Sequence, residues 1–367
     1  MRIGIDGREL QGRPTGTGRY LRSLLRVWAR EGRDSLVVYF HGPAPRLPLF
    51  EASGFELRPI GDERAGGLLW QQSLLPRATR EDRLDVFFSP AYECPLALRV
   101  PRVTAIHDLS FFARPHEFGW LDGCKRRLLV AASVRASAQI LACSEFTRNQ
   151  IAARFPEAAA RVSLVPLGPD DDLPPAPSRE EARRRLGIAG PVAISVGSLF
   201  ERRCVPELLR GFVRVLGSFP TARLEIVGEN RSHPYRDYRE EAWRLGLGGA
   251  VRFSGFADES RLADLYAAAD VAVSLSEYEG FGLPALEALA RGVPLVIGNR
   301  PSLSELFSDA AVGVEPRSPA EIADAIVRLL SEPLLRQDRI ARGRALSARF
   351  SWRGTADLTR AALERAA

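Results

Sequence analysis

The sequence predicts an α/β fold of two successive doubly wound domains, each a parallel sheet covered by helices. Short apolar, β-rich runs alternate along the chain with amphipathic helical stretches, which is typical of such sheets. The alternation stops once, at a stretch rich in proline and acid, and then starts again. The length of 367 residues suits two ordinary domains.

The first half of the chain predicts a domain over residues 1–168. Its apolar runs, which we expect to be strands, cover residues 2–5, 35–40, 85–89, 102–106, 139–143 and 162–166. Helical patterns separate them, so the connections are of the kind that parallel strands need.

An interdomain linker is predicted within residues 167–190, where prolines and acids gather. A capped helix begins there at Ser178, with Glu180 and Glu181 behind it. The second domain is expected over 169–349, and its predicted strands cover residues 192–197, 223–228, 250–255, 271–275 and 294–298. A last helix, within 350–367, could pack on its own domain or cross back to the first, and the pattern leaves both open.

The composition, 46% hydrophobic and 26% charged, is that of a soluble globular protein. The opening residues do not resemble a signal peptide, and no apolar run reaches the roughly 18 residues of a membrane span. We therefore expect a cytoplasmic protein. The four cysteines are scattered, which argues against a disulfide framework and against a zinc site.

Positive charge is concentrated in the first half. Residues 1–168 hold 24 basic and 17 acidic side chains, whereas residues 169–367 hold 27 and 28. The first half can therefore face an anionic partner. No basic run with interleaved aromatics supports a nucleic acid. A peripheral contact with a membrane surface or a phosphate-bearing lipid explains the charge better than a nucleic acid does. A merely solvated face explains it as well as the lipid contact.

Ligands of doubly wound sheets bind outside the carboxyl ends of the strands, so the loops there are the candidate binding positions. After the first strand, "RPTGTGRYL" (13–21) places Gly16 and Gly18 at a helix start, where backbone N–H groups can meet phosphate. An ordinary strand-to-helix turn explains this stretch equally well. His107 directly follows the strand at 102–106. Histidine more often has a structural role, but this position at the carboxyl end of a strand favours a functional one.

In the second half, "VGSLFERRCVPELLRGF" (196–212) joins a strand to a helix and carries Arg202 and Arg203. Adjacent guanidinium groups can clamp a diphosphate through forked hydrogen bonds. A solvated surface pair beside Glu201 is the competing interpretation, and the spacing alone does not separate the two.

The segment "SEYEGFGLPALEALARG" (276–292) is the most informative in the chain. Glu279 and Glu287, with seven residues between them, flank a Gly-Phe-Gly turn that leads into a helix expected at about 283–291. A helix dipole explains one glutamate, and a glycosidase dyad usually takes its acids from separate elements. A ligand that contains a sugar, phosphates and a ribose fits the segment better. One carboxylate would bind the sugar, the other would bind the ribose, and the backbone amides between them would bind the phosphates. The segment therefore predicts a nucleotide-sugar site.

With these motifs the chain resembles the family 4 retaining glycosyltransferases, which have the GT-B fold of two Rossmann-like domains facing a central cleft. The resemblance extends over nearly the whole length and is closest to the branch of bacterial polysaccharide and O-antigen assembly, which contains many mannosyltransferases. It is carried by "RIGIDGRELQGRPTGTGRY", "IHDLSFF", "CSEFTRNQI", "VGSLFERR", the long segment "VRFSGFADESRLADLYAAADVAVSLSEYEGFGLPALEALARGVPLVIGN" and "FSW". The pair of glutamates is its most diagnostic part.

Position by position, the resemblance implies roles at the donor. Glu287 would hold the ribose and Glu279 the donor sugar. The turn would meet sugar and diphosphate through its backbone, and Arg203 stands where the family usually has a diphosphate-binding lysine. The turn residues concerned are Gly280, Phe281, Gly282 and Leu283.

The resemblance also implies roles outside that segment. His107 would be an active-site histidine near the sugar, Gly16 would approach the donor phosphate, and Phe256 falls at the base pocket. Two positions depart from the family pattern: Ser198 stands in place of a frequent arginine, and Cys204 in place of a frequent asparagine or glycine. Binding of the diphosphate charge is therefore left to Arg203 and its neighbour Arg202.

The function implied is transfer of a sugar, best matched by mannose from GDP-mannose, to a saccharide or lipid-linked acceptor bound by the first domain. Catalysis would involve His107, Glu279 and Arg203, without a cofactor or metal. The acidic run Asp170-Asp171-Asp172 reads as a solvated turn among linker prolines. A UDP-sugar-dependent glucosyl or N-acetylglucosaminyl transferase, a nucleotide-sugar epimerase or hydrolase, and a non-catalytic nucleotide-sugar binding protein are the alternatives.

Overall fold

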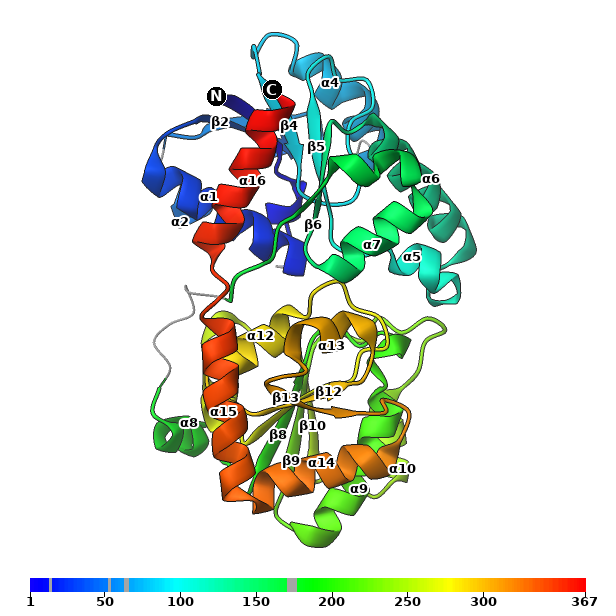
Figure 1. Cartoon of the computed structure of the whole chain (residues 1–367), viewed down its shortest axis with the longest axis vertical. Coiled ribbons are helices and arrows are strands. Elements are labelled where there is room, and N and C mark those ends of the chain that lie inside the picture. Colours follow the sequence, from blue (N-terminus) through cyan, green and yellow to red (C-terminus); the bar gives the residue numbers. More distant parts are fainter. Residues whose placement is uncertain (13–14, 52–53, 63–65, 170–176) are drawn as a thin grey trace. The chain divides into compact units, whose positions relative to one another are not determined.

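The computed structural model describes residues 1–12, 15–51, 54–62, 66–169 and 177–367 (Figure 1). The chain divides into two units. The first contains Met1–Ala113, Trp120–Gly168 and Ser351–Ala367, and the second contains Arg114–Gly119 and Pro169–Phe350. The end of the chain thus returns to the first unit, and a short segment from the N-terminal half belongs to the second.

The first unit is built on a parallel sheet of seven strands in the order β3-β2-β1-β4-β5-β6-β7. The strands are β1 (Arg2–Asp6), β2 (Ser35–His41), β3 (Glu56–Ile60), β4 (Val86–Ser89), β5 (Arg102–Ile106), β6 (Gln139–Ala142) and β7 (Val162–Leu164). The central strands are almost continuously apolar and buried, as expected for a parallel sheet covered on both faces.

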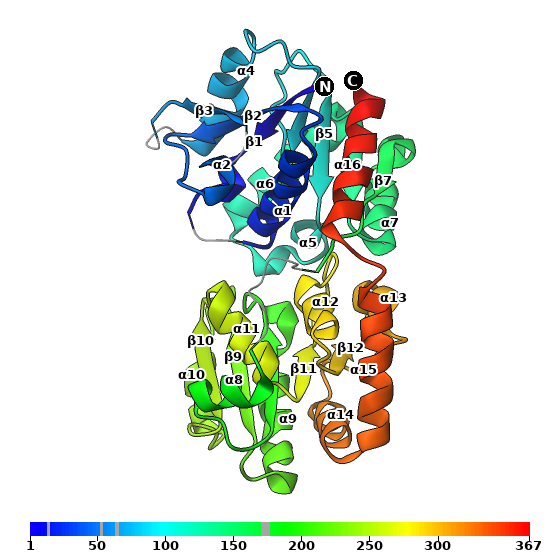
Figure 2. The same cartoon turned by 90° about the vertical axis from the view of Figure 1, so that its left-hand side faces the viewer.

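Helices on both faces of this sheet complete the first unit (Figure 2). They are α1 (Gly16–Glu31), α2 (Pro48–Glu51), α3 (Gly67–Leu69), α4 (Leu75–Ala78), α5 (Ser110–Ala113), α6 (Trp120–Ala136), α7 (Glu145–Arg154) and α16 (Trp352–Ala366). In α1, Thr15 caps the N-terminus by accepting a hydrogen bond from the Gly18 N–H, and Gly32 ends the helix in the left-handed conformation.

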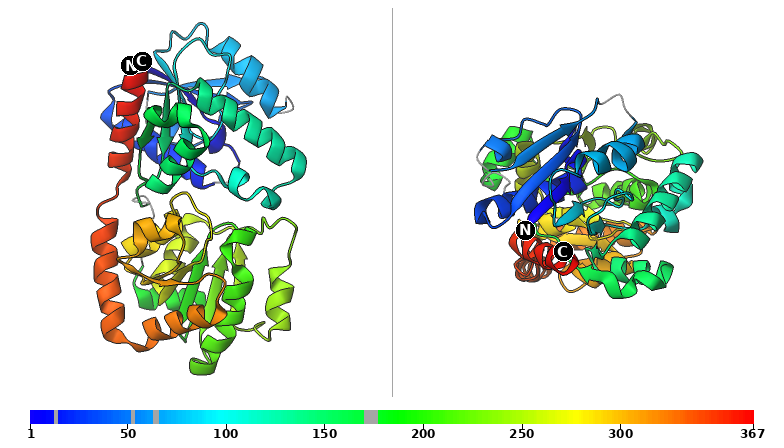
Figure 3. Two further views of the ribbon diagram at one scale, coloured as in Figure 1. Left: turned by 45° about the vertical axis from the view of Figure 1, so that its right-hand side comes forward. Right: turned by 90° about the horizontal axis from the view of Figure 1, so that it is seen from above.

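The C-terminal helix α16 lies beside α1 (Figure 1), and the two ends of the chain, marked N and C in Figure 3, lie close together in the first unit. The indole of Trp28 donates to the Ala356 carbonyl at 3.3 Å. The guanidinium of Arg360 binds Glu31 at 2.5 Å and Asp34 at 2.9 Å, and all three side chains are largely buried. These contacts anchor the end of the chain in the first unit.

The second unit has a parallel sheet of six strands in the order β10-β9-β8-β11-β12-β13. The strands are β8 (Val192–Val196), β9 (Arg223–Val227), β10 (Val251–Gly255), β11 (Val271–Ser274), β12 (Leu295–Gly298) and β13 (Ala311–Val314). The helices are α8 (Arg179–Leu186), α9 (Val205–Ser218), α10 (Tyr238–Arg244), α11 (Glu259–Ala268), α12 (Leu283–Ala290), α13 (Pro301–Phe307), α14 (Pro319–Ser331) and α15 (Pro333–Ser347).

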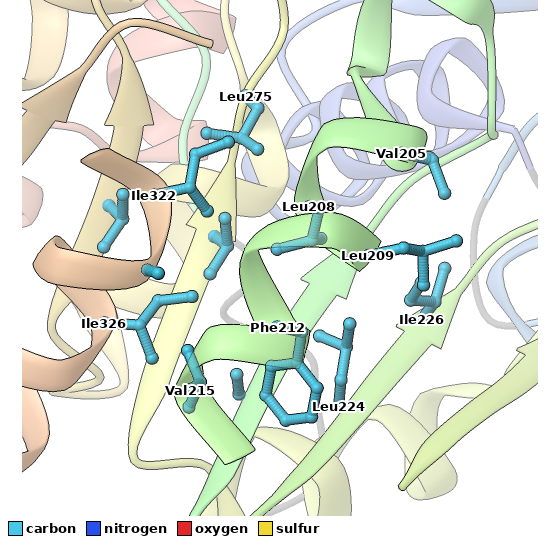
Figure 4. Close-up of a cluster of buried hydrophobic side chains, with 14 of the residues drawn as sticks. Val205, Leu208, Leu209, Phe212, Val215, Leu224, Ile226, Leu275, Ile322 and Ile326 are labelled. Atoms are coloured by element: carbon cyan, nitrogen blue, oxygen red, sulfur yellow. The ribbon is translucent and has the colours of Figure 1, made fainter. Parts of the chain in front are cut away.

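The core of the second unit forms where α9 and α14 pack together on the sheet (Figure 4). Leu208 and Phe212 of α9 meet Ile322 and Ile326 of α14, and all four side chains are fully buried. Burying an apolar side chain of this size stabilises the fold by about 1.5–3 kcal/mol. This packing gives the loops above the strands a rigid support.

Both sheets follow the doubly wound order in which the strand sequence reverses beside the first strand of the unit. The reversal lies between β1 and β4 in the first sheet and between β8 and β11 in the second. The fold class predicted from the sequence is thereby confirmed. Two edge strands, β3 and β13, were not predicted, and α12 is one residue shorter than expected.

Two further features concern the chain as a whole. Among the described residues, no helix is both long enough and apolar enough to span a membrane. None of the four cysteines forms a disulfide.

Candidate functional site

The loops after β8 and β11 meet at the point where the strand order of the second sheet reverses, which is where doubly wound folds bind ligands. The loop after β8 carries Arg203, and the loop after β11 carries Glu279. Nη2 of Arg203 donates to Oε1 of Glu279 at 3.2 Å. The structure therefore brings together two residues that the sequence places 76 positions apart.

The guanidinium of Arg203 lies directly over the backbone at the end of β8. Gly197, with a φ of +127°, would place a Cβ atom 2.8 Å from Nη2 of Arg203. Gly228 packs below, where a Cβ atom would lie 2.1 Å from the Gly197 carbonyl oxygen. Nε of Arg203 is buried and has no hydrogen-bond partner among the described residues. This arginine thus has donor capacity left for a ligand.

Arg202, although adjacent in sequence, has a different environment. Its side chain is 9% exposed, its guanidinium lies 4.1 Å from the centre of the Phe200 ring, and Nη1 binds Glu117 at 2.5 Å. In this structure the Arg202 side chain therefore pairs with Glu117, whereas the Arg203 side chain pairs with Glu279.

Cys204, next in the chain, has a backbone conformation that is uncommon for cysteine. Its φ of 53° and ψ of 40° are in the left-handed region, which asparagine and glycine adopt more readily than other residues. The cysteine is fully buried, and burial raises the pKa of its thiol to about 12, so the side chain is neutral.

The N-terminus of α12 lies in the same loop region as Glu279. Gly282 is the N-cap in a left-handed conformation with a φ of 89°, and no side chain of the described residues caps the helix. A Cβ atom at Gly282 would approach the Leu303 side chain to 2.9 Å, so glycine is required here. Backbone N–H groups at such a terminus attract anions.

The remaining predicted residues of this segment differ in how they are placed. The ring of Phe281 is buried against Phe350, with ring centres 5.7 Å apart, so only its backbone can face a ligand. Leu283 begins α12, directly after Gly282, and Gly280 precedes Phe281 in the same loop.

Glu287 lies on the second turn of α12 and is buried. The hydroxyl of Tyr266 donates to its Oε2 at 3.2 Å. Phe256 follows β10 after Gly255 and is half exposed, so its ring face is available for stacking.

In the first unit, His107 follows β5 and its imidazole is fixed by its neighbours. Nε2 lies 2.8 Å from the Pro90 carbonyl oxygen, which only accepts, so Nε2 carries the hydrogen and Nδ1 keeps a lone pair. Burial lowers the pKa of His107, more than the Pro90 hydrogen bond raises it. The rings of Tyr20 and Tyr92 pack at 4.9 and 5.7 Å. The imidazole is therefore held neutral.

The glycines of the first turn have separate roles. Gly18 is required by the fold, since a Cβ atom there would lie 2.4 Å from the Glu9 carbonyl oxygen. Gly16 begins α1, and a Cβ atom there would meet nothing within 4 Å. Gly16 and His107 belong to the first unit, whereas the arginine, glutamate and glycine residues described above belong to the second.

Within the described part of the chain, no group of three or more His, Cys, Asp or Glu side chains could hold a metal ion. The run Asp170-Asp171-Asp172 lies outside the described residues.

Sequence reasoning missed a set of charged residues around Arg202, namely Arg114, Glu117, Glu277 and Arg317. Glu277 lies in the segment 276–292, two residues before Glu279, and nothing in the local sequence indicates that it forms an ion pair. Glu117 comes from the N-terminal half, so only the tertiary structure reveals its partner.

Two glycosyltransferase family models match the chain, one in each half. The family model described as Glycosyltransferase Family 4 matches residues 14–173, and the one described as Glycosyl transferases group 1 matches residues 178–346. The chain is 28% identical over 362 residues to O-antigen chain mannosyltransferase B of Escherichia coli, covering 92% of this chain and 93% of that protein.

Solved structures show the same fold. HepE of Anabaena, in complex with UDP and glucose, matches with a TM-score of 0.79 and 19% identity, covering 99% of both chains. WaaG, a glycosyltransferase involved in lipopolysaccharide biosynthesis, matches with a TM-score of 0.75 and 19% identity, covering 99% of this chain and 98% of that one. The family models thus identify a glycosyltransferase, and the fold is GT-B. More particularly, the first half of the chain matches the model of glycosyltransferase family 4 and the second half that of the group 1 glycosyltransferases.

Proposed function

We propose that this protein is a retaining hexosyltransferase that moves mannose from GDP-mannose to a saccharide or lipid-linked saccharide in cell-surface polysaccharide assembly. The observation that carries the proposal is the pairing of Arg203 with Glu279 beside the uncapped N-terminus of α12. This arrangement offers a cation and backbone N–H groups to a diphosphate and a carboxylate to an adjoining sugar.

Each part of the donor has a candidate partner in the second unit. Arg203 and the backbone of Gly282 and Leu283 would bind the diphosphate, while Glu279 would accept hydrogen bonds from the sugar. Glu287, already oriented by Tyr266, would accept hydrogen bonds from the ribose. The half-exposed ring of Phe256 would stack on the base.

The transfer step would break the bond between the anomeric carbon and the diphosphate oxygen. The acceptor oxygen would attack the anomeric carbon from the same face, and its proton would pass to the leaving diphosphate. Arg203 and the α12 N-terminus would stabilise the negative charge that develops on that leaving group. No protein base is then needed.

His107 would contribute as a neutral group. Its lowered pKa and its Nε2 hydrogen bond to Pro90 keep Nδ1 as a hydrogen-bond acceptor at neutral pH. Such a group can orient a sugar hydroxyl without adding positive charge next to an oxocarbenium-like centre. No metal or cofactor takes part in the proposed step.

Mannose and guanosine are supported by the similarity to O-antigen chain mannosyltransferase B over 92% of this chain. The competing donor is a UDP-sugar, because HepE, which shares the fold, was solved with UDP and glucose. Thermal-shift titration with GDP, UDP, ADP and their sugars decides the base, since a ligand bound only by the folded state raises the apparent stability.

Reaction type is tested with the donor so identified and a panel of saccharide acceptors. NMR of the product is expected to show a new glycosidic bond with the anomeric configuration of the donor. Donor consumption without a new bond would indicate an epimerase or hydrolase, and tight donor binding without turnover across the panel would indicate a binding protein.

A peripheral membrane contact on the cytoplasmic side is also proposed, and α6 is the element that supports it. Trp120, Leu121 and Leu128 are 77%, 73% and 73% exposed on this helix. Lys125 and Arg126 are exposed beside them. Exposed aromatic and aliphatic side chains with adjacent cations suit an anionic lipid surface, where a lipid-linked acceptor would be found.

A further inference from the structure

The segment Arg114–Gly119 lies between α5 and α6 in the chain, yet it belongs to the second unit. Its centre is a single 3₁₀ turn, Pro115–Glu117. Both ends of this segment continue into helices of the first unit. Its place in the second unit therefore reflects the contacts it makes and not its neighbours in the chain. We call this segment the strap.

Glu117 is the buried anchor of the strap. Its side chain is 1% exposed and receives two guanidinium groups, from Arg202 at 2.5 Å and from Arg114. Little water can reach this pair, so removing the carboxylate would take the ion-pair partner from a largely buried guanidinium. Glu117 therefore helps to hold the Arg202 side chain in its place.

A second set of contacts joins the strap to the loop after β11. Nη2 of Arg114 binds Glu277 at 3.2 Å, and the Glu277 N–H donates to the Arg202 carbonyl oxygen at 2.8 Å. Arg317 binds the same carboxylate at 2.6 Å and lowers the pKa of Glu277, which stays ionised. The strap thus braces the loops after β8 and β11 at once.

These two loops carry Arg203 and Glu279. Arg202 and Arg203 belong to one 3₁₀ turn, Glu201–Arg203, and Glu277 stands two positions before Glu279. Fixing Arg202 and Glu277 therefore fixes the backbone from which the Arg203–Glu279 pair extends. A shift of that backbone would carry the Arg203 guanidinium away from its place over Gly197.

We propose that Glu117 is a positioning residue for diphosphate recognition, acting through Arg202 on Arg203. This inference rests on the proposed function, because it requires that Arg203 binds a donor diphosphate. Arg202 would serve as a structural link and not as a phosphate ligand, since Glu117 already occupies its guanidinium. The effect is expected at the diphosphate and not at the ribose, because the ion pairs of the strap involve Arg202 and Glu277, whereas Glu287 is contacted by Tyr266 of α11.

The matched variants are Glu117→Gln and Glu31→Gln. Glu31 also accepts a largely buried arginine, Arg360, at 2.5 Å, but in the first unit and far along the chain from the proposed site. Both changes remove one carboxylate charge from a similar ion pair. Any effect that only reflects lost stability should therefore appear in both.

The experiment is calorimetric titration at a temperature where each variant is folded by circular dichroism. The probes are GDP and guanosine or, if the wild-type protein binds UDP instead, UDP and uridine. E117Q is expected to weaken diphosphate binding by about tenfold or more and nucleoside binding by less than about twofold, as loss of one charge-assisted contact implies. E31Q is expected to bind both probes like the wild-type protein.

Unchanged or tighter diphosphate binding by E117Q would overturn the inference, and so would an equal loss for diphosphate and nucleoside. If E117Q does not fold, Glu117→Asp replaces it, because it keeps the charge at a shorter reach. Wild-type diphosphate affinity in E117D would then overturn the inference. Failure of the wild-type protein to bind either diphosphate would overturn the proposed function itself and this inference with it.

Discussion

The guanidinium of Arg203 and the carboxylate of Glu279 meet at 3.2 Å where the strand order of the second sheet reverses. Neither residue is fully exposed, with side chains 15% and 17% accessible. An ion pair between partly exposed groups adds little to stability. Its position above the ends of β8 and β11 instead makes it the centre of the proposed donor site.

Substitution of either partner is expected to reduce transfer while leaving the fold intact. Glu279→Ala and Arg203→Ala should each lower turnover by about tenfold or more, the size expected for losing a charge-assisted contact made by the donor. Initial rates with the identified donor, together with circular dichroism, measure this. Turnover like that of the wild-type protein in either variant would refute the site assignment.

The glycine beneath Arg203 provides a second prediction. Gly197→Ala places a methyl group 2.8 Å from Nη2 of Arg203 at a φ of +127°, so the guanidinium must move and the backbone is strained. We expect a loss of about 1–3 kcal/mol in the free energy of unfolding and weaker donor binding.

The control for this substitution is Gly217→Ala, in α9, where a Cβ atom would meet nothing within 4 Å. That change is expected to raise stability by about 0.5–1 kcal/mol, because alanine favours the helix. Denaturant unfolding compares the two. If G197A is as stable and binds donor as well as the wild-type protein, the geometry described at β8 is wrong.

The proposed ribose recognition by Glu287 predicts discrimination between ribo- and deoxyribonucleotides. The wild-type protein should bind GDP or UDP more tightly than the 2′,3′-dideoxy analogue, and Glu287→Gln should lose most of that preference, worth about tenfold for a hydrogen bond to a charged group. Titration of both ligands into both proteins checks this. A preference retained in full by E287Q would exclude the assigned role.

The lowered pKa of His107 predicts a pH-dependent stability. Burial is its main cause, and Asp108 opposes it more weakly. Because the unfolded chain binds a proton near the ordinary value of 6.5 and the folded protein does so only at lower pH, stability falls as pH drops below about 6.5. His107→Gln should flatten this part of the melting-temperature profile between pH 7 and pH 5.

Exposed His116 supplies the control, since His116→Gln removes a histidine that is not buried. The profile of H116Q should follow that of the wild-type protein. Identical slopes for wild-type and H107Q proteins in this pH window would show that His107 does not titrate as described.

The α6 surface predicts binding to anionic vesicles. Replacing Trp120 and Leu128 with serine should reduce co-sedimentation with phosphatidylglycerol vesicles by about tenfold, given the apolar area removed. Leu334→Ser, at a position 83% exposed in the second unit, is the control for loss of an exposed apolar side chain. Equal binding by all three proteins would remove α6 as the membrane contact.

Most of the fold could be predicted from the sequence, because the central strands are continuous apolar runs. The two missed strands are at sheet edges. β3 (Glu56–Ile60) contains charged residues and Pro59, and β13 (Ala311–Val314) is a short run interrupted by Gly313. Edge strands need less apolar surface and tolerate proline and charge, so the apolar pattern that would predict them from the sequence is weak.

The candidate site was predictable where its residues are contiguous and not where they depend on tertiary contacts. The segment from Glu279 to Glu287 includes its own turn and helix start, so its arrangement follows from local rules. Arg202 and Arg203 look equivalent in sequence, yet only one of them faces Glu279. What separates them is Glu117, a residue 85 positions away that no local pattern connects to them.

Calorimetric titration of wild-type protein and R203A with a nucleoside diphosphate and the matching monophosphate tests whether Arg203 is the diphosphate ligand of a nucleotide-sugar site. The wild-type protein is expected to bind the diphosphate at least about tenfold more tightly than the monophosphate, and R203A is expected to bind the two nearly alike. A preference for the diphosphate that survives in R203A, or that is absent from the wild-type protein, would show that Arg203 is not this ligand.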